Sequence, residues 1–311
     1  MKYIFGPVPS RRLGMSLGVD IVPFKTCTLD CIYCQLGVTT DKIAERQSFV
    51  PQDEVLAELK QVLDEDTKRV DFITFSGSGE PTLNSQIGEM INSIKTFTDV
   101  QVAVLTNGTL LYREDLREDL SQADLVVPSL DAMTDETLAK VNRPNKDITA
   151  QRAIDGLKAF SQDFKGKIWL EIMLVKGIND DPDELKQMAD FVRTLKLDRI
   201  HFNTVIRPPA ESFAQPITPE EMQKIVSMFD DRAEVIADFD KMVKHKELDA
   251  QSIEKVEAQI ISLVNRRPCT LDDISSSMGL HKNEIIKHLD HLLQKSSIKQ
   301  TRRENKIYWH V

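Results

Sequence analysis

The sequence predicts an α/β protein whose parallel sheet forms an open, partial barrel, followed by a small C-terminal domain of different character. The main observation is that short apolar runs alternate with amphipathic helical stretches, a pattern typical of βαβ units and a parallel sheet. We count six such units, too few for a closed eight-fold barrel. With 311 residues, of which 41% are hydrophobic, the chain can bury a large core, and its length favours two domains.

The expected elements follow one another along the chain. Strands are predicted at residues 17–23, 71–76, 101–107, 124–131, 167–175 and 199–207, and helices at 52–66, 84–96, 114–121, 149–163, 183–197 and 218–230. Asn84, Asp183 and Thr218 have the side chains expected at helix starts. Residues 5–14 are rich in Gly and Pro, which predicts a loop or a short edge hairpin, and residues 233–239 predict one more edge strand.

Alternation along the strands predicts which side chains face the inside of the barrel. On the last strand the more apolar face, which we expect under the helices, consists of Ile200, Phe202, Thr204 and Ile206. The inward set is then His201, Asn203, Val205, Arg207, Thr74, Ser76, Asn107, Ser129, Asp131, Glu171 and Met173. Any one of these could be a hydrogen-bonded interior residue, but together, near the strand ends, they predict a binding site.

Three of the four cysteines, Cys27, Cys31 and Cys34, lie within eight residues, directly after an apolar run. A chain of this size needs no disulfide staple, so the C-x3-C-x2-C spacing indicates a metal site. Iron–sulfur clusters are held by closely spaced thiolates, and three ligands leave one iron of a four-iron cluster open to a substrate or cofactor. A zinc site without its fourth ligand and chance clustering are the alternatives.

A second motif is the turn Gly77-Ser78-Gly79-Glu80, which directly follows an apolar strand. Glycines allow the backbone to turn tightly and to present bare N–H and C=O groups to a ligand, and the Glu80 carboxylate suits a ligand with an ammonium group. Taken alone, such a turn is more often structural than functional.

The cysteine spacing, with Tyr33 just before the last cysteine, resembles the signature of the radical S-adenosylmethionine (SAM) enzymes. Residues 77–80 resemble the Gly-Gly-Glu-type motif of that family, with Ser78 replacing its first glycine. The resemblance covers roughly residues 1–240 and is nearest to wyosine-synthase-like and Fe–S oxidoreductase members. It implies a partial (β/α)6 TIM barrel of radical SAM type, a [4Fe–4S] cluster on the three cysteines, and SAM at the open iron.

The resemblance also implies roles for individual residues. Gly79 and Glu80 would hold the amino group of SAM, Tyr33 would pack near its adenine, and Asn107, Ser129 and Asp131 would contact its ribose or carboxylate. Lys176 could pair with the SAM carboxylate, a surface lysine being the alternative. An electron from a donor such as flavodoxin or ferredoxin would cleave SAM to a 5′-deoxyadenosyl radical. Arg207 and Glu211, in a proline-rich loop, are candidates for substrate binding.

The tail differs from the rest of the chain, so we expect the barrel at residues 1–240, a charged linker at 241–248 and a second domain at 249–311. The tail holds ten Lys and Arg against eight Asp and Glu, net +2, whereas residues 1–248 hold 30 against 41, net −11. Three helical stripes and two short strands resemble a winged helix-turn-helix. Its candidate contacts to a partner are Lys282, Lys287, His288 and His291 on the exposed side of the third helix, and Arg302 and Arg303 on the wing.

Two classes of function remain at this point: a radical SAM enzyme, and a regulator that senses SAM or redox state and binds DNA. For the enzyme, tRNA is the first expected substrate, with a peptide or a protein partner as the alternative. The small positive charge of the tail leaves nucleic acid, a peptide or protein, and a purely structural role open for that domain. We see neither a membrane span nor a signal peptide, which predicts a cytoplasmic protein that does not bind membranes.

Overall fold

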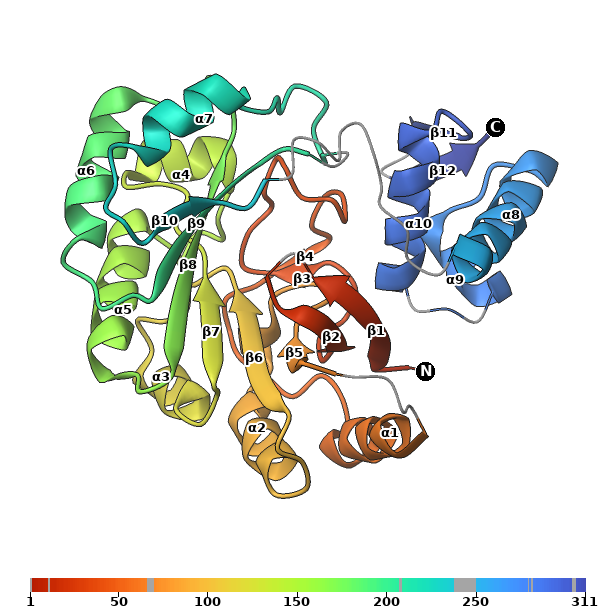
Figure 1. Ribbon diagram of the computed structural model, residues 1–311, viewed down its shortest axis with the longest axis horizontal. Coiled ribbons are helices and arrows are strands. Elements are labelled where there is room, and N and C mark those ends of the chain that lie inside the picture. Colours follow the sequence, from red (N-terminus) through yellow and green to blue (C-terminus); the bar gives the residue numbers. More distant parts are fainter. Residues whose placement is uncertain are drawn as a thin grey trace.

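One eight-stranded sheet organises the N-terminal part of the protein (Figure 1). The computed structural model describes residues 2–10, 12–65, 70–206, 209–237, 250–278, 280, 282–303 and 306–311. The sheet has the order β1 (Ile4–Ser10), β2 (Gly14–Val19), β5 (Phe72–Phe75), β6 (Gln101–Thr106), β7 (Leu125–Pro128), β8 (Lys167–Leu174), β9 (Arg199–Thr204) and β10 (Ala233–Val235). β1 pairs antiparallel with β2, and all the other pairs are parallel. The expected open, partial barrel and the extra edge strand are therefore confirmed.

The six expected helices are present and pack on the outer face of this sheet (Figure 1). They are α1 (Gln52–Glu65), α2 (Ile87–Lys95), α3 (Glu114–Leu120), α5 (Ala150–Asp163), α6 (Pro182–Val192) and α7 (Pro219–Val226). Sequence reasoning missed the short helix α4 (Asp135–Val141) and the 3-10 turn η1 (Pro81–Leu83). The three residues of η1 are too few to show a helical period.

The helix starts were predicted with mixed success. Thr218 caps α7 in a full capping box with Glu221, as its position suggested. The cap of α6 is Asp181, not Asp183, because Asp181 accepts the backbone N–H groups of Asp183 and Glu184. Asn84 ends η1 and accepts the N–H of Gln86, so α2 begins three residues later than expected.

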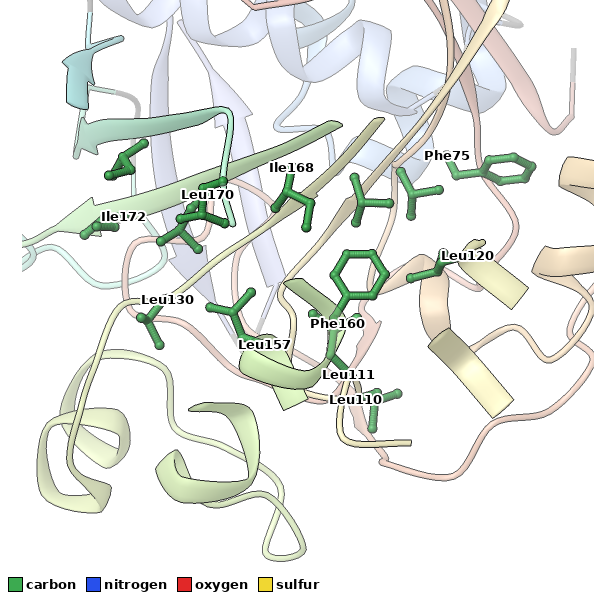
Figure 2. Close-up of a cluster of buried hydrophobic side chains, with 14 of the residues drawn as sticks. Phe75, Leu110, Leu111, Leu120, Leu130, Leu157, Phe160, Ile168, Leu170 and Ile172 are labelled. Carbon is green, nitrogen blue, oxygen red and sulfur yellow. The ribbon is translucent and has the colours of Figure 1, made fainter. Parts of the chain in front are cut away.

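The outer core lies between the sheet and the helices. In Figure 2, Leu157 and Phe160 of α5 lie in one cluster with Ile168 and Leu170 of β8. Phe160 is only 1% exposed, and fully burying such a side chain stabilises the fold by about 1.5–3 kcal/mol. Strand alternation is confirmed here, because Ile200 and Phe202 belong to this cluster.

The inner face of the sheet has an apolar layer of side chains and, nearer the carboxyl ends of the strands, a polar layer. In the apolar layer, Leu13 of the β1–β2 turn packs with Val127 and Trp169. Above this layer, the Glu171 carboxylate pairs with Arg12 at 2.6 Å and accepts a hydrogen bond from Asn203 at 3.0 Å. The inward positions predicted for Glu171 and Asn203 are consistent with these contacts. Val205 packs in the outer core instead, because β9 already ends at Thr204.

The C-terminal part consists of α8 (Ala250–Arg266), α9 (Leu271–Met278), α10 (Lys282–Gln294) and the antiparallel pair β11 (Lys299–Arg303) and β12 (Lys306–His310). These elements enclose a core of their own, which includes Ile260, Ile285, Trp309 and the buried Cys269. The order of elements is the expected one. The winged helix-turn-helix assignment and the domain limits stay predictions, and the linker at 241–248 lies outside the described residues.

This C-terminal part packs against the loop that carries the cysteines. Phe24 and Leu36, which flank that loop, contact its core, and the Lys282 ammonium lies 4.5 Å from the centre of the Phe24 ring. A small cavity at the junction is lined by Leu36 and Gly37 on one side and by Leu289 and Trp309 on the other.

In the part of the chain that is described, no helix is long and apolar enough to cross a membrane.

Gly156 offers a test of the packing between α5 and the loop after β6. A Cβ atom at this position would lie 2.2 Å from the backbone nitrogen of Tyr112. Gly156→Ala should therefore lower the free energy of unfolding by about 1–3 kcal/mol, measured by chemical denaturation, although alanine is the better helix former. The exposed control Lys158→Ala, on the same helix, should change it by less than about 0.5 kcal/mol. Equal stability of both variants would contradict this close approach.

Candidate metal and cofactor site

The cysteine loop begins after β2, at the carboxyl edge of the parallel sheet, and backbone hydrogen bonds join it to the glycine-rich turn after β5. Lys25 N–H donates to the Ser78 carbonyl at 2.6 Å, and Glu80 N–H donates to the Thr26 carbonyl at 3.0 Å. A Cβ on Gly79 would lie 1.9 Å from that same Thr26 oxygen. Only glycine allows this approach, so the two predicted motifs form one structural unit.

Each of the three sulfur atoms has its own N–H donor. The Asn107 side-chain amide lies 3.5 Å from the Cys27 sulfur, and the Asn142 amide lies 3.2 Å from that of Cys31. The Lys25 ammonium lies 3.3 Å from the sulfur of Cys34. All three cysteines are half-buried. Donors around sulfur stabilise thiolate ligands, so the surroundings suit metal ligation.

Two of the thiols hold their protons tightly in the metal-free protein. Burial, reinforced by the nearby Glu80 carboxylate, raises the pKa of Cys27 to about 12. Burial, followed by the two neighbouring cysteines, raises the pKa of Cys31 well above its ordinary value. These thiols release their protons only when a positive metal centre compensates the charge of the thiolates.

The three thiols of the cysteine loop provide the ligand set of a cluster. Among the residues that the structure describes, no group of three His, Cys, Asp or Glu side chains is arranged to hold one metal ion. A mononuclear zinc site needs such convergence. A cubane cluster does not, because each thiolate ligates a different iron. Three half-buried thiols, each with an N–H donor, fit the ligand set of a [4Fe–4S] cluster.

Glu80 is buried in a cage of donors, with 2% of its surface exposed. Its Oε1 accepts hydrogen bonds from the Thr82 N–H and hydroxyl and from the Thr106 hydroxyl. Its Oε2 accepts only the Asn107 N–H, at 2.7 Å. Burial raises the pKa of this carboxyl, although these donors oppose the rise. No ion pair to Glu80 occurs within the described ranges, and Oε2 has room for one more donor.

Asp131 organises the other side of the cysteine loop. Its carboxylate accepts hydrogen bonds from the Tyr33 hydroxyl, the Asn142 amide at 2.8 Å and the Met173 N–H at 2.9 Å. Burial raises the pKa of Asp131 and, together with the Asp131 charge, raises that of Tyr33. Tyr33 therefore stays protonated and donates to Asp131. This network positions Cys31, which shares the Asn142 amide.

Of the other residues predicted at the site, some lie near the cysteine loop and some lie away from it. Ser129 is half-buried beside Glu171. Lys176 does not join the cysteine loop, because its ammonium pairs with Glu221 at the surface, at 3.0 Å. Glu211 does join it: its N–H donates to the Ile32 carbonyl at 2.9 Å, and its carboxylate pairs with Arg143 at 2.7 Å. Arg207 lies outside the described residues.

Sequence reasoning missed two residues that contact the cysteines. Lys25 stands only two positions before Cys27, and this closeness was the available signal. Asn142 follows α4 directly, and with that helix unrecognised its position could not be inferred.

The partner-binding candidates of the C-terminal part are largely engaged within the protein. Lys282 is half-buried over Phe24 and pairs with Asp272. The exposed positions expected for His288 and His291 are wrong: both are mostly buried against Glu257 of α8. The apolar stripe of α10 faces the core of the C-terminal part, and His288 and His291 lie along the edge of that stripe. Arg302 is exposed, as predicted, whereas the side chains of Lys287 and Arg303 lie outside the described residues.

Comparison with known proteins finds a matching family and several relatives. Residues 21–192 match the radical SAM superfamily. A protein named GTPase Obg from Brachyspira hyodysenteriae is 37% identical over 96% of this chain, which spans 44% of that relative's length. A UPF0026 protein from Helicobacter pylori is 33% identical over 96% of this chain and 94% of its own length. A probable dual-specificity RNA methyltransferase RlmN from Thermotoga petrophila is 23% identical over 61% of this chain and 55% of its own length.

Solved structures show the same fold. A radical SAM methyltransferase from Sphaerobacter thermophilus superimposes with a TM-score of 0.55 at 19% identity, covering 71% of this chain and 66% of its own. SuiB from Streptococcus suis, bound to the precursor peptide SuiA, gives a TM-score of 0.51 at 17% identity, covering 70% of this chain and 48% of its own. The family match extends over more than half of this chain and includes the cysteine loop. The chain therefore belongs to the radical SAM superfamily, and is an enzyme whose cofactors are a [4Fe–4S] cluster and SAM.

Proposed function

We propose that this enzyme binds its [4Fe–4S] cluster through Cys27, Cys31 and Cys34, cleaves SAM reductively and removes a hydrogen atom from its substrate. When bound and reduced by a flavodoxin or ferredoxin, the cluster supplies the electron that splits SAM into methionine and a 5′-deoxyadenosyl radical, which abstracts the hydrogen. The observation that supports the proposal is the set of three thiols, each with its own N–H donor, at the carboxyl edge of the parallel sheet. The match to an enzyme superfamily favours an enzyme over a DNA-binding regulator.

The SAM pocket is proposed beside Cys27. Glu80 Oε2 has a free acceptor position and shares the Asn107 residue with the Cys27 sulfur, so an ammonium group bound there would compensate a buried carboxylate. Gly79 places this carboxylate by allowing the close approach to Thr26. Ser129 and Asp131 complete the proposed pocket, with Tyr33 held in place by Asp131.

The cysteine assignment is tested by single substitutions. Cys27→Ala, Cys31→Ala and Cys34→Ala should each abolish both the cluster and SAM cleavage, because each removes one thiolate ligand. Iron and sulfide content and the formation of 5′-deoxyadenosine in anaerobically reduced protein measure the two effects. The matched control is Cys269→Ala, in the core of the C-terminal part, which should retain both. Loss of the cluster from the control, or zinc in the wild-type protein, would refute the assignment.

The role of Glu80 predicts a separable loss of SAM affinity. Glu80→Gln should weaken SAM binding by roughly ten- to a hundred-fold while the cluster still assembles, because a charge-assisted hydrogen bond is lost. Equilibrium binding of SAM to the reconstituted protein measures this, with the exposed Glu45→Gln as control.

Glu80 should also make the affinity for SAM depend on pH. Burial raises the pKa of Glu80 in the free protein, so wild-type SAM affinity should fall on acidification at a higher pH than an ordinary glutamate would allow. If Glu80→Gln bound SAM as tightly as the wild type, Glu80 would not belong to the SAM pocket.

RNA, with tRNA foremost, is the first proposed substrate. The support is the sequence likeness to a relative named as an RNA methyltransferase. Exposed Arg302 on the β11–β12 pair would supply a phosphate contact. A peptide or protein is the second candidate, because the apolar side chains of α10 and β12 line a cavity beside the cysteine loop, with Leu36, Leu289 and Trp309 around it.

Isotope transfer distinguishes these substrates. Cells grown in deuterated medium are separated into RNA, protein and small-molecule fractions, and each is incubated with reduced enzyme and unlabelled SAM. The RNA fraction should transfer deuterium into 5′-deoxyadenosine, detected by mass spectrometry, and ribonuclease digestion of that fraction to nucleosides should abolish the transfer. Transfer from the protein fraction alone would instead establish the peptide or protein candidate.

A further inference from the structure

Lys25 is held in an unusual place for a lysine. Its side chain is only 3% exposed, and its backbone has a left-handed φ of 64°, which is uncommon for a residue with a side chain. The N–H of Lys25 donates to Ser78, and its carbonyl accepts the N–H groups of Thr40 and Asp41. These bonds fix the backbone so that the ammonium reaches the Cys34 sulfur at 3.3 Å.

The Lys25 ammonium lies against a sulfur atom rather than a carboxylate. No ion pair involving Lys25 is present in the described parts of the chain, and its one side-chain hydrogen bond is to sulfur. A buried ammonium without an anionic partner is strongly unfavourable. Three thiolates around a [4Fe–4S] core provide net negative charge at this position, and that charge grows by one unit when the cluster accepts an electron.

We propose that Lys25 is a positioning residue that orients the Cys34 sulfur and raises the reduction potential of the cluster, an inference that rests on the proposed ligation by the three cysteines. A fixed positive charge favours the more negative, reduced state, and hydrogen bonds to sulfur act in the same direction. One electron would pass from a reduced flavodoxin or ferredoxin to the cluster, and no bond would form or break at Lys25. Lys25 would thereby make reduction of the cluster by such donors more favourable.

The other two donors to sulfur differ from Lys25 in charge. Asn107 and Asn142 present neutral amides to Cys27 and Cys31, so they orient sulfur without adding charge. Lys42 provides a contrasting case. Its backbone pairs with Cys27 between the short strands β3 (Thr26–Cys27) and β4 (Asp41–Lys42), but its side chain is exposed. Water and salt screen an exposed charge, so Lys42 should have little influence on the cluster.

The test is a redox titration of the cluster, followed by electron paramagnetic resonance without SAM or substrate. Lys25→Met, which keeps the length and the backbone strain, should make one-electron reduction about ten-fold less favourable, a potential about 59 mV more negative. Lys25→Arg, which keeps the charge, should recover most of the difference. Lys42→Met should match the wild type, and iron and sulfide content confirms that each variant is loaded.

The outcomes separate this inference from the proposed function. Equal potentials in wild type, Lys25→Met and Lys25→Arg would overturn the role of Lys25 while leaving the cluster assignment intact. If Lys25→Met cannot bind the cluster, Lys25→Gln must show a lower potential than Lys25→Arg, and loss of the cluster from all Lys25 variants would make Lys25 an assembly residue instead. A wild-type protein without a four-iron cluster would overturn both proposals.

Discussion

The site depends on the close backbone contact between the cysteine loop and the glycine-rich turn. Two hydrogen bonds, between Lys25 and Ser78 and between Glu80 and Thr26, align the loop with the end of β5. The contact exists only because Gly79 lacks a side chain. One short junction therefore places the proposed cluster ligands, the Lys25 ammonium and the Glu80 carboxylate within a single rigid unit.

Electrostatics gives the two ends of this unit different roles. The buried Lys25 ammonium group lies against Cys34, and the buried Glu80 carboxyl group lies beside Cys27. Neither has an ion-pair partner among the described residues, yet such charges are normally paired when buried. A negative cluster and the ammonium of SAM are the groups that would compensate them. In the proposed sites, the protein would hold in advance the charges that its two cofactors require, which would reduce reorganisation when they bind.

The C-terminal part packs directly against the cysteine loop. Its core receives Phe24 and Leu36 from the two ends of that loop, and Lys282 is engaged with Phe24 and Asp272. A partner bound at this junction would therefore lie beside the proposed cluster. The burial of His288 and His291 against Glu257 removes two of the side chains that suggested a basic recognition helix.

The sequence by itself determined the α/β architecture, the six strand–helix units and the cysteine loop, because these depend on local periodicity and close spacing along the chain. It also indicated Glu80 and Asp131, which stand at predicted strand ends. Only the tertiary structure decided that Asn142 joins Cys31, that Lys176 turns away to Glu221, and that Arg12 enters the barrel to meet Glu171. These pairs are separated by 45 to 159 residues, and contacts over such separations are set by how the elements pack, which local pattern does not encode.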